Sequence, residues 1–144
     1  ELDNADGYNG WGIGAEDTLP NASNTTLSDA NIFGVAHDID PSVCGEINYM
    51  VLGSSPSRQF VVNFSEICHF SCNDLQTNSQ IILYESSNTI DINIYDKPTC
   101  ETWNSGLAVV GVQNIEDTIA FTPPERNTSV WEATDEFCIF TPSL

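Results

Sequence analysis

A chain of 144 residues with 21 acidic and three basic side chains has a formal net charge of −18 at pH 7. Binding to a phosphate backbone needs clustered Lys and Arg, and docking on anionic lipid needs them too, so we expect neither. No stretch reaches the roughly 18 apolar residues of a membrane span, which makes membrane insertion an unexpected role as well.

The first half of the chain predicts one strand and one hairpin after a polar start. Residues 1–30 are rich in Gly, Asn, Asp and Ser, with a short aromatic island, YNGWGIG. IFGVAHDID then predicts a strand that ends at Asp40-Pro41. EINYMVL alternates apolar and polar residues with a period of two, and the turn GSSPS joins it to RQFVVNF. Residues 46–64 are therefore predicted to form a β-hairpin.

The second half continues with short strands. SQIILYES and TIDINIY predict a second hairpin, with Ile90, Ile92 and Ile94 on one face of a half-buried antiparallel strand. DKPTCETWNSG predicts a loop, LAVVGVQN predicts a buried central strand, and TIAFT and FCIFT predict two closing strands. No segment has a sustained 3.6-residue apolar period, so helices are expected to be short or absent.

Together these elements predict an all-β fold, an antiparallel β-sandwich or jelly roll, in a single domain. Within it we expect a Gly/Asn/Asp-rich N-terminal segment with a short strand over residues 1–30 and the β-sandwich over residues 31–144.

The cysteines indicate the compartment. The chain has five, Cys44, Cys68, Cys72, Cys100 and Cys138, and none of them forms a CxxC pair. Such a set in an Asn/Ser/Thr-rich chain predicts disulfides and an extracellular or cell-surface location. Because five is odd, at least one thiol is left over unless it pairs with another chain.

Few residues suggest chemistry. Asp3, Asp6 and Asn9 lie around Gly7 and offer oxygen ligands for Ca²⁺, although EF-hand spacing is not met and an Asx-rich turn is the alternative. Calcium is therefore the one open cofactor, and no other is expected. The motifs G-x-S-x-G, HExxH, G-x-G-x-x-G and the P-loop do not occur, so we expect no enzyme.

Two tryptophans and one arginine are candidate ligand-binding residues. Trp103 and Trp131 lie near predicted loops, where they could stack on a sugar, but aromatic residues that fill the ends of a core are the alternative. Arg126 follows a double proline and could bind an acidic sugar. The alternative is a scaffold role, because the guanidinium has five fixed donors that can tie loop carbonyls and a carboxylate together.

Four segments, SPSRQFVVNF, SQIILYESSNTIDINI, DKPTCETWNSGLAVVGVQN and PPERNTSVWEATDEFCIFTP, together resemble a β-sandwich module of exported Bacteroidota surface proteins. The resemblance covers roughly residues 31–142. In those proteins the module lies among repeat and adhesion domains, often ahead of a gliding-motility-associated C-terminal domain that resembles a signal for type IX secretion.

The resemblance carries further expectations. It implies one or more strands ahead of YNGWGIG, so absence of the first N-terminal strands from this chain is an open alternative. It also implies a disulfide between Cys72 and Cys100 and leaves the pairing of the other cysteines open. Thr18 and Thr118 lie in Asp-Thr-apolar tripeptides that resemble an O-glycosylation acceptor of such proteins. The implied partners are other domains of the same large surface protein, neighbouring copies, or surface glycans.

Two functions from different classes remain. The first is a non-catalytic module of an exported adhesin or filament protein, acting in attachment or as a structural spacer. The second is a carbohydrate-binding module of a secreted enzyme, with or without calcium. An exposed aromatic pair beside a groove favours the second, and aromatics buried at the ends of the sandwich favour the first.

Overall fold

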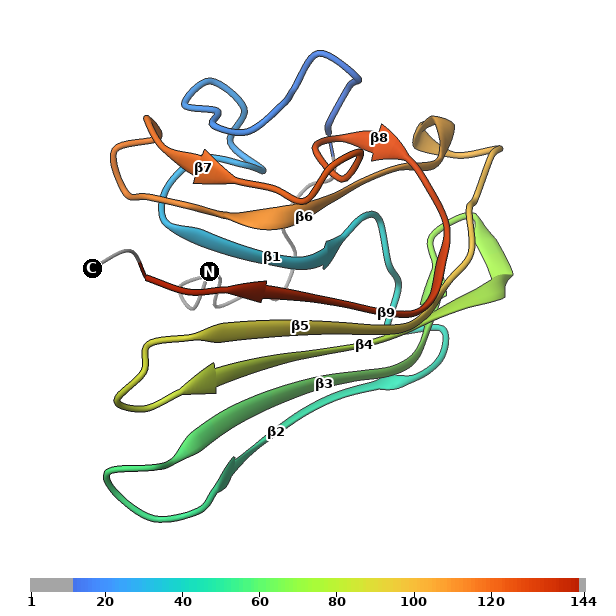
Figure 1. The fold of residues 1–144 in the computed structure, drawn as a ribbon. Coiled ribbons are helices and arrows are strands. Elements are labelled where there is room, and N and C mark those ends of the chain that lie inside the picture. Colours follow the sequence, from blue (N-terminus) through green and yellow to red (C-terminus); the bar gives the residue numbers. More distant parts are fainter. Residues whose placement is uncertain (1–11, 143–144) are drawn as a thin grey trace. The chain divides into compact units, whose positions relative to one another are not determined.

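A computed structural model describes residues 12–142 and shows a chain built of strands (Figure 1). The expected all-β class is confirmed: the strands form two antiparallel sheets, as in a β-sandwich. Among the described residues, helical structure is limited to the short 3₁₀ turn η1 (Asn104–Gly106), in agreement with the missing 3.6-residue period.

The chain divides into two compact units, each made of two stretches of sequence. In the described part, residues up to Asp38 and Asn104–Trp131 form the first unit, and Ile39–Trp103 and the residues from Glu132 onward form the second. The expected separation of residues 1–30 from 31–144 stays a prediction, because residues 1–11 lie outside the described part.

The first unit is organised around β6 (Leu107–Gln113). It pairs antiparallel with β1 (Asn31–Ala36), β7 (Ala120–Phe121) and β8 (Ser129–Val130). The run from Leu107 to Gly111 is buried, as expected for a central strand with two covered faces. The core of this unit is a cluster of five buried side chains: Ile13, Leu19, Leu27, Phe33 and Val109.

Side-chain amides attach the irregular residues 12–30 to this small sheet. The Gln113 side chain accepts a hydrogen bond from the Asn21 N–H (2.8 Å) and donates one to the Leu27 carbonyl (2.9 Å). Asn127 accepts from the Leu19 N–H (2.7 Å) and donates to the Leu19 carbonyl (2.9 Å). Because buried backbone groups must be paired, these amides take the place of a neighbouring strand.

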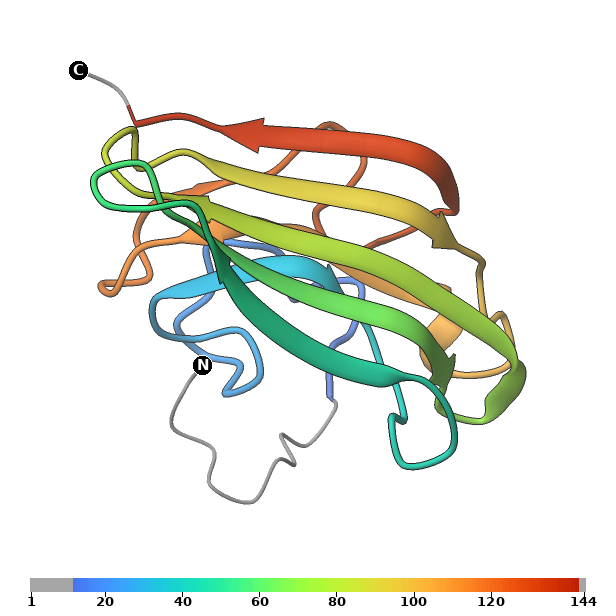
Figure 2. The same cartoon turned by 90° about the horizontal axis from the view of Figure 1, so that it is seen from below.

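The second unit is a five-stranded sheet in the order β2-β3-β4-β5-β9, so β2 and β9 are its edges (Figures 1 and 2). Its strands are β2 (Glu46–Leu52), β3 (Gln59–His69), β4 (Cys72–Tyr84), β5 (Ile90–Lys97) and β9 (Ala133–Phe140). Both predicted hairpins, β2-β3 and β4-β5, are confirmed in the expected antiparallel pairing.

The alternation expected in β5 is also present. Ile92 and Ile94 are fully buried, whereas Asp91 and Asn93 on the opposite face remain partly accessible. A half-buried antiparallel strand has this pattern because successive side chains point to opposite faces.

Several bounds differ from the predictions. The strand expected to continue to Asp40 ends at Ala36, and Ile39 forms only an isolated bridge with His69. β3 and β4 extend towards each other until only Phe70 and Ser71 remain between them. The predicted strand TIAFT contributes two residues to the sheet.

Candidate functional site

The outer edge strand β2 is exposed along its whole length. All seven of its residues are exposed, and the exposed fractions of its large apolar side chains lie between 46% and 74%. These side chains are Ile47, Tyr49, Met50, Val51 and Leu52. An accessible run of apolar residues on a sheet edge differs from the scattered apolar residues of an ordinary surface, and it indicates a site of interaction.

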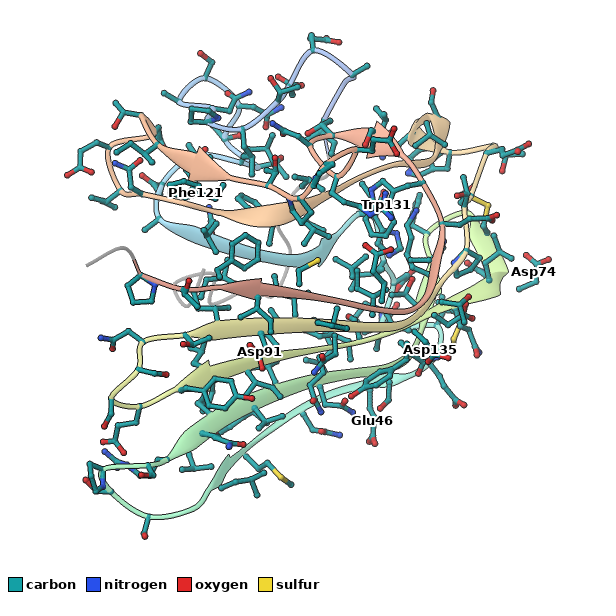
Figure 3. The ribbon with its side chains drawn as sticks, in the orientation of Figure 1. Glu46, Asp74, Asp91, Phe121, Trp131 and Asp135 are labelled. Atoms are coloured by element: carbon teal, nitrogen blue, oxygen red, sulfur yellow. A yellow bond between two sulfur atoms is a disulfide. The ribbon has the colours of Figure 1, made fainter. Side chains whose placement is uncertain are left out.

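β2 pairs with β3 without a bulge, so the opposite, unpaired edge of β2 is also regular. Its pairing with β3 runs from Glu46↔Ser65 to Leu52↔Gln59 without a shift, and no other strand of the described residues pairs with it. Sheet edges are normally protected by Lys, Pro, a bulge or inward-pointing charges. β2 has none of these, and its one charged residue is Glu46 at its start (Figure 3).

The start of β2 depends on Gly45. Its φ is +83°, a left-handed conformation that glycine adopts without strain. A Cβ at this position would collide with the backbone carbonyl oxygens of Ser65 and Glu66. Gly45 therefore lets the chain pass close to the end of β3 and enter the ladder in the observed register.

A hollow of about 290 Å³ lies on one face of the sheet at the end of β2. Val51 pairs with Phe60, and Phe60 pairs with Leu83, so these three apolar side chains form a row across three strands. The Tyr49 ring lies 5.7 Å from the Phe60 ring and extends this apolar face. The lining residues are Val51, Arg58, Phe60, Leu83, Tyr84 and Glu85.

An ion pair forms the polar wall of this hollow. Arg58 Nη2 and Nε donate to the two carboxylate oxygens of Glu85 at 2.6 and 2.9 Å, and the Arg58 backbone N–H donates to the same side chain at 3.0 Å. These three donors lower the pKa of Glu85 to about 2. The guanidinium and the carboxylate neutralise each other at the margin of the hollow.

Both disulfides lie in the second unit. The structure joins Cys72 to Cys100, the pair that the sequence resemblance implied, and joins Cys44 to Cys68.

The Phe70 ring, in the turn between β3 and β4, lies 5.0 Å from the Trp103 ring, and their exposed fractions are 42% and 39%. Trp103 is thus one half of a partly exposed aromatic pair, and Phe70 was not among the predicted residues.

A buried histidine, His69, is the last residue of β3 and directly precedes this turn. His69 is fully buried and lies 2.8 Å from the Thr77 hydroxyl. Burial and, secondly, the positive charge of Lys97 lower the pKa of His69 to about 4, against the opposing charge of Asp96. His69 is therefore neutral at physiological pH.

Trp131 and Arg126 form a pair in the first unit. Trp131 is 6% exposed and its indole N–H donates to the Ala108 carbonyl at 3.1 Å. The Arg126 guanidinium lies 4.5 Å from the centre of the Trp131 ring, and the Arg126 carbonyl accepts from the Val110 N–H. Trp103 belongs to the second unit, so the three candidate ligand-binding residues do not gather in one unit.

The remaining candidate residues fall in different places. Thr18 and Thr118 are exposed and lie in irregular segments, and Thr118 accepts a hydrogen bond from Asn114 at 3.1 Å. The candidate calcium ligands Asp3, Asp6 and Asn9 lie outside the described residues. Within residues 12–142 no group of three or more His, Cys, Asp or Glu side chains could hold a metal ion, and no helix is long and apolar enough to cross a membrane.

A family model described as NIDO related matches residues 4–142. The chain belongs to the NIDO-related family. Such domains are typically non-enzymatic extracellular modules, and the family together with the two disulfides indicates that this NIDO-related chain is extracellular. No curated protein and no solved structure matches the chain. Nothing in the family match links the NIDO-related chain to Bacteroidota adhesins or to type IX secretion.

Proposed function

We propose that this chain is a non-catalytic module of an exported cell-surface adhesin or filament protein, and that it contributes an attachment surface. The NIDO-related family and the two disulfides support an extracellular module with a structural or adhesive role. The burial of Trp131 supports it further, because that ring packs inside its unit.

The observation that carries the proposal is the exposed edge strand β2. A sheet edge presents unpaired N–H and C=O groups that can pair with another chain, and extracellular assemblies use this geometry to join segments. An accessible apolar edge of seven residues suits a protein that binds other chains, since a solitary spacer has no use for it.

The finer identity of the parent protein is part of the proposal. The order of the four sequence segments supports a module from a long Bacteroidota surface protein exported by type IX secretion and associated with gliding motility. Its partners would then be other domains of the same protein or neighbouring copies, without nucleic acid and without membrane insertion.

Deletion of the module within its parent protein tests the proposal. Cells that carry the shortened parent at an equal surface level should attach less to their substrate, and a deletion of a neighbouring domain of similar length is the control. Measured turnover of a glycan or peptide by the purified chain would contradict the non-catalytic role.

The Phe70–Trp103 pair favours a second candidate, a carbohydrate-binding module of a secreted enzyme. Partly exposed aromatic rings stack on sugars, and two nearby disulfides hold this pair in place. A glycan array with and without calcium tests both this candidate and the calcium ligands Asp3, Asp6 and Asn9. Binding that Trp103→Ala abolishes and Phe137→Ala retains would establish it, since Phe137 is an exposed aromatic on β9.

O-glycosylation at Thr18 and Thr118 belongs to the same proposal. Both residues are exposed, which leaves room for a sugar. Intact-mass measurement of native protein should show added hexose that is reduced in each Thr→Ala variant. A native mass equal to that of the bare polypeptide would contradict the modification.

A further inference from the structure

We propose that the outer edge of β2 accepts a basic, extended peptide segment as an added strand, with one of its apolar side chains in the hollow beside Val51. This inference rests on the proposed attachment role and names the chemistry of the partner. The partner has Lys or Arg on one face and apolar side chains on the other.

The edge geometry provides the backbone part of this recognition. β2 has seven residues in unbroken register with β3, so alternate residues direct their N–H and C=O groups away from β3. An incoming strand can pair with these groups along the whole edge. β9, the other edge of the sheet, differs: it contains Asp135 and Glu136, and Asp135 has a left-handed φ of 54°. The irregular backbone makes β9 the less suitable edge for continuous pairing.

The hollow provides the side-chain part. Its apolar wall is the row Val51, Phe60 and Leu83, and Val51 lies on the edge strand itself. Side chains of an added strand alternate between the two faces, so every second one lies on the same face as Tyr49 and Val51. An apolar residue of the partner placed beside Val51 can enter the hollow and remove apolar surface from water.

Charge selects the partner among those that could occupy this edge. A second copy of the chain also has a net charge of −18, and the long-range repulsion between two such molecules opposes their pairing. The N-terminal residues 1–11 contain three acids and no base, so the same argument applies to them. The negative potential that repels a second copy and residues 1–11 attracts a basic segment, because opposite potentials steer association.

The three cations of the chain do not oppose a basic partner at this edge. Arg58, the cation beside the hollow, gives two side-chain donors to Glu85 and is neutralised there. Lys97 is 2% exposed, and Arg126 lies over the Trp131 ring in the first unit. The net charge thus protects β2 from other copies in the way that edge lysines protect other sheets, and it leaves the edge open to a basic strand.

Fluorescence anisotropy with labelled synthetic peptides tests the proposal. The probe is a nine-residue peptide of alternating Lys and Val, and the comparison peptides alternate Lys with Ser or Glu with Val. The Lys-Val peptide should bind at least about tenfold more tightly than either comparison peptide. Equal binding of the Lys-Ser peptide would reduce the interaction to charge alone and overturn the proposal.

Two substitutions on β2 form a matched pair. Val51→Ser removes an apolar side chain beside the hollow, whereas Met50→Ser makes the same kind of change on the opposite face of the same strand, and neither adds a charge. Both positions are more than half exposed, so both variants should fold, which circular dichroism verifies. Val51→Ser should weaken binding of the Lys-Val peptide at least about tenfold, and Met50→Ser by less than about threefold. Equal effects of the two changes would contradict the role of the hollow.

Other occupants give distinct results. Concentration-dependent dimers that Val51→Ser abolishes would identify a second copy as the occupant. Peptide binding that tightens more than about tenfold after deletion of residues 1–11 would identify that segment. Either result overturns the proposal. Absence of peptide binding, together with loss of cell attachment when the whole module is deleted, would refute the basic strand and leave the adhesive function standing.

Discussion

Arg126 illustrates how a single side chain can serve the fold in a chain with only three basic residues. Its guanidinium covers the Trp131 ring at 4.5 Å, and its carbonyl accepts a hydrogen bond from β6. A cation over an aromatic face is attracted by the ring quadrupole, and the aliphatic part of the side chain covers apolar surface. These contacts support the scaffold role that the sequence offered as one alternative.

Replacement of Arg126 by Ala should lower the free energy of unfolding by about 1 kcal/mol, because the stacking and the covered apolar surface are lost. Thermal unfolding of the variant measures this loss. Arg58→Ala is the matched control: Arg58 makes an exposed ion pair, so its removal should cost less. An unchanged melting temperature for Arg126→Ala, combined with lost binding of acidic sugars, would assign Arg126 to a ligand.

The buried His69 makes stability depend on pH. Its pKa falls from 6.5 to about 4 on folding, so the unfolded state binds more protons between these values. The contribution of neutral His69 to the free energy of unfolding is therefore fully present above pH 6.5. It is lost as the pH falls towards 4, and its size is on the order of 2 kcal/mol.

Urea unfolding at several pH values measures this dependence. The free energy of unfolding of the native chain, minus that of His69→Gln, should rise with pH through the window from 4 to 6.5. The subtraction removes the titration of the many carboxylates. A difference that is constant with pH would show that His69 has the same pKa in both states.

At the scale of elements, β2 and the turn between β3 and β4 show where sequence-based prediction succeeds and where it stops. Both hairpins could be predicted because alternation and turn residues are local signals. The turn at Phe70 and Ser71 could not, since Phe-Ser is not one of the dipeptides typical of a two-residue hairpin turn. The exposure of β2 could not be predicted either, because the order of strands depends on long-range pairing.

The same limit applies to the candidate site. Trp103 could be selected from its residue type and its predicted loop position. Its partner Phe70 is about 30 residues away in sequence, and the two rings come into contact only in the folded unit. The hollow requires Val51, Phe60 and Leu83 from three strands. Such a row depends on the register between neighbouring strands. A single sequence specifies that register only within a predicted hairpin.

The disulfide between Cys72 and Cys100 should stabilise the second unit through the unfolded state. Its sequence separation is 28, for which loop-closure entropy gives roughly 3–4 kcal/mol. Replacing both residues by Ser should lower the free energy of unfolding by about that amount.

Non-reducing peptide mapping of the native chain should recover Cys72 linked to Cys100 and Cys44 linked to Cys68. A linked peptide that contains Cys138 would contradict this connectivity.

At the scale of the whole molecule, the net charge of −18 and the exposed edge belong together. Repulsion between copies opposes self-association through this apolar edge strand, which contains neither Lys nor Pro. Because this repulsion is screened within about 8 Å at physiological ionic strength, added salt should weaken both the protection against self-association and the attraction for a basic partner. The family and the two disulfides indicate an extracellular module, and the charge and the exposed edge are the features on which the proposed binding role rests.

Residue-resolved amide hydrogen exchange, with and without the Lys-Val peptide, tests the central claim most directly. Alternate amides of Glu46–Leu52 face outward from β3 and should exchange rapidly in the chain alone. The peptide should slow these amides at least about tenfold and leave those around Phe70 and Trp103 unchanged. Unchanged exchange in β2 at saturating peptide, or slowing confined to the Phe70–Trp103 pair, would contradict attachment through the β2 edge.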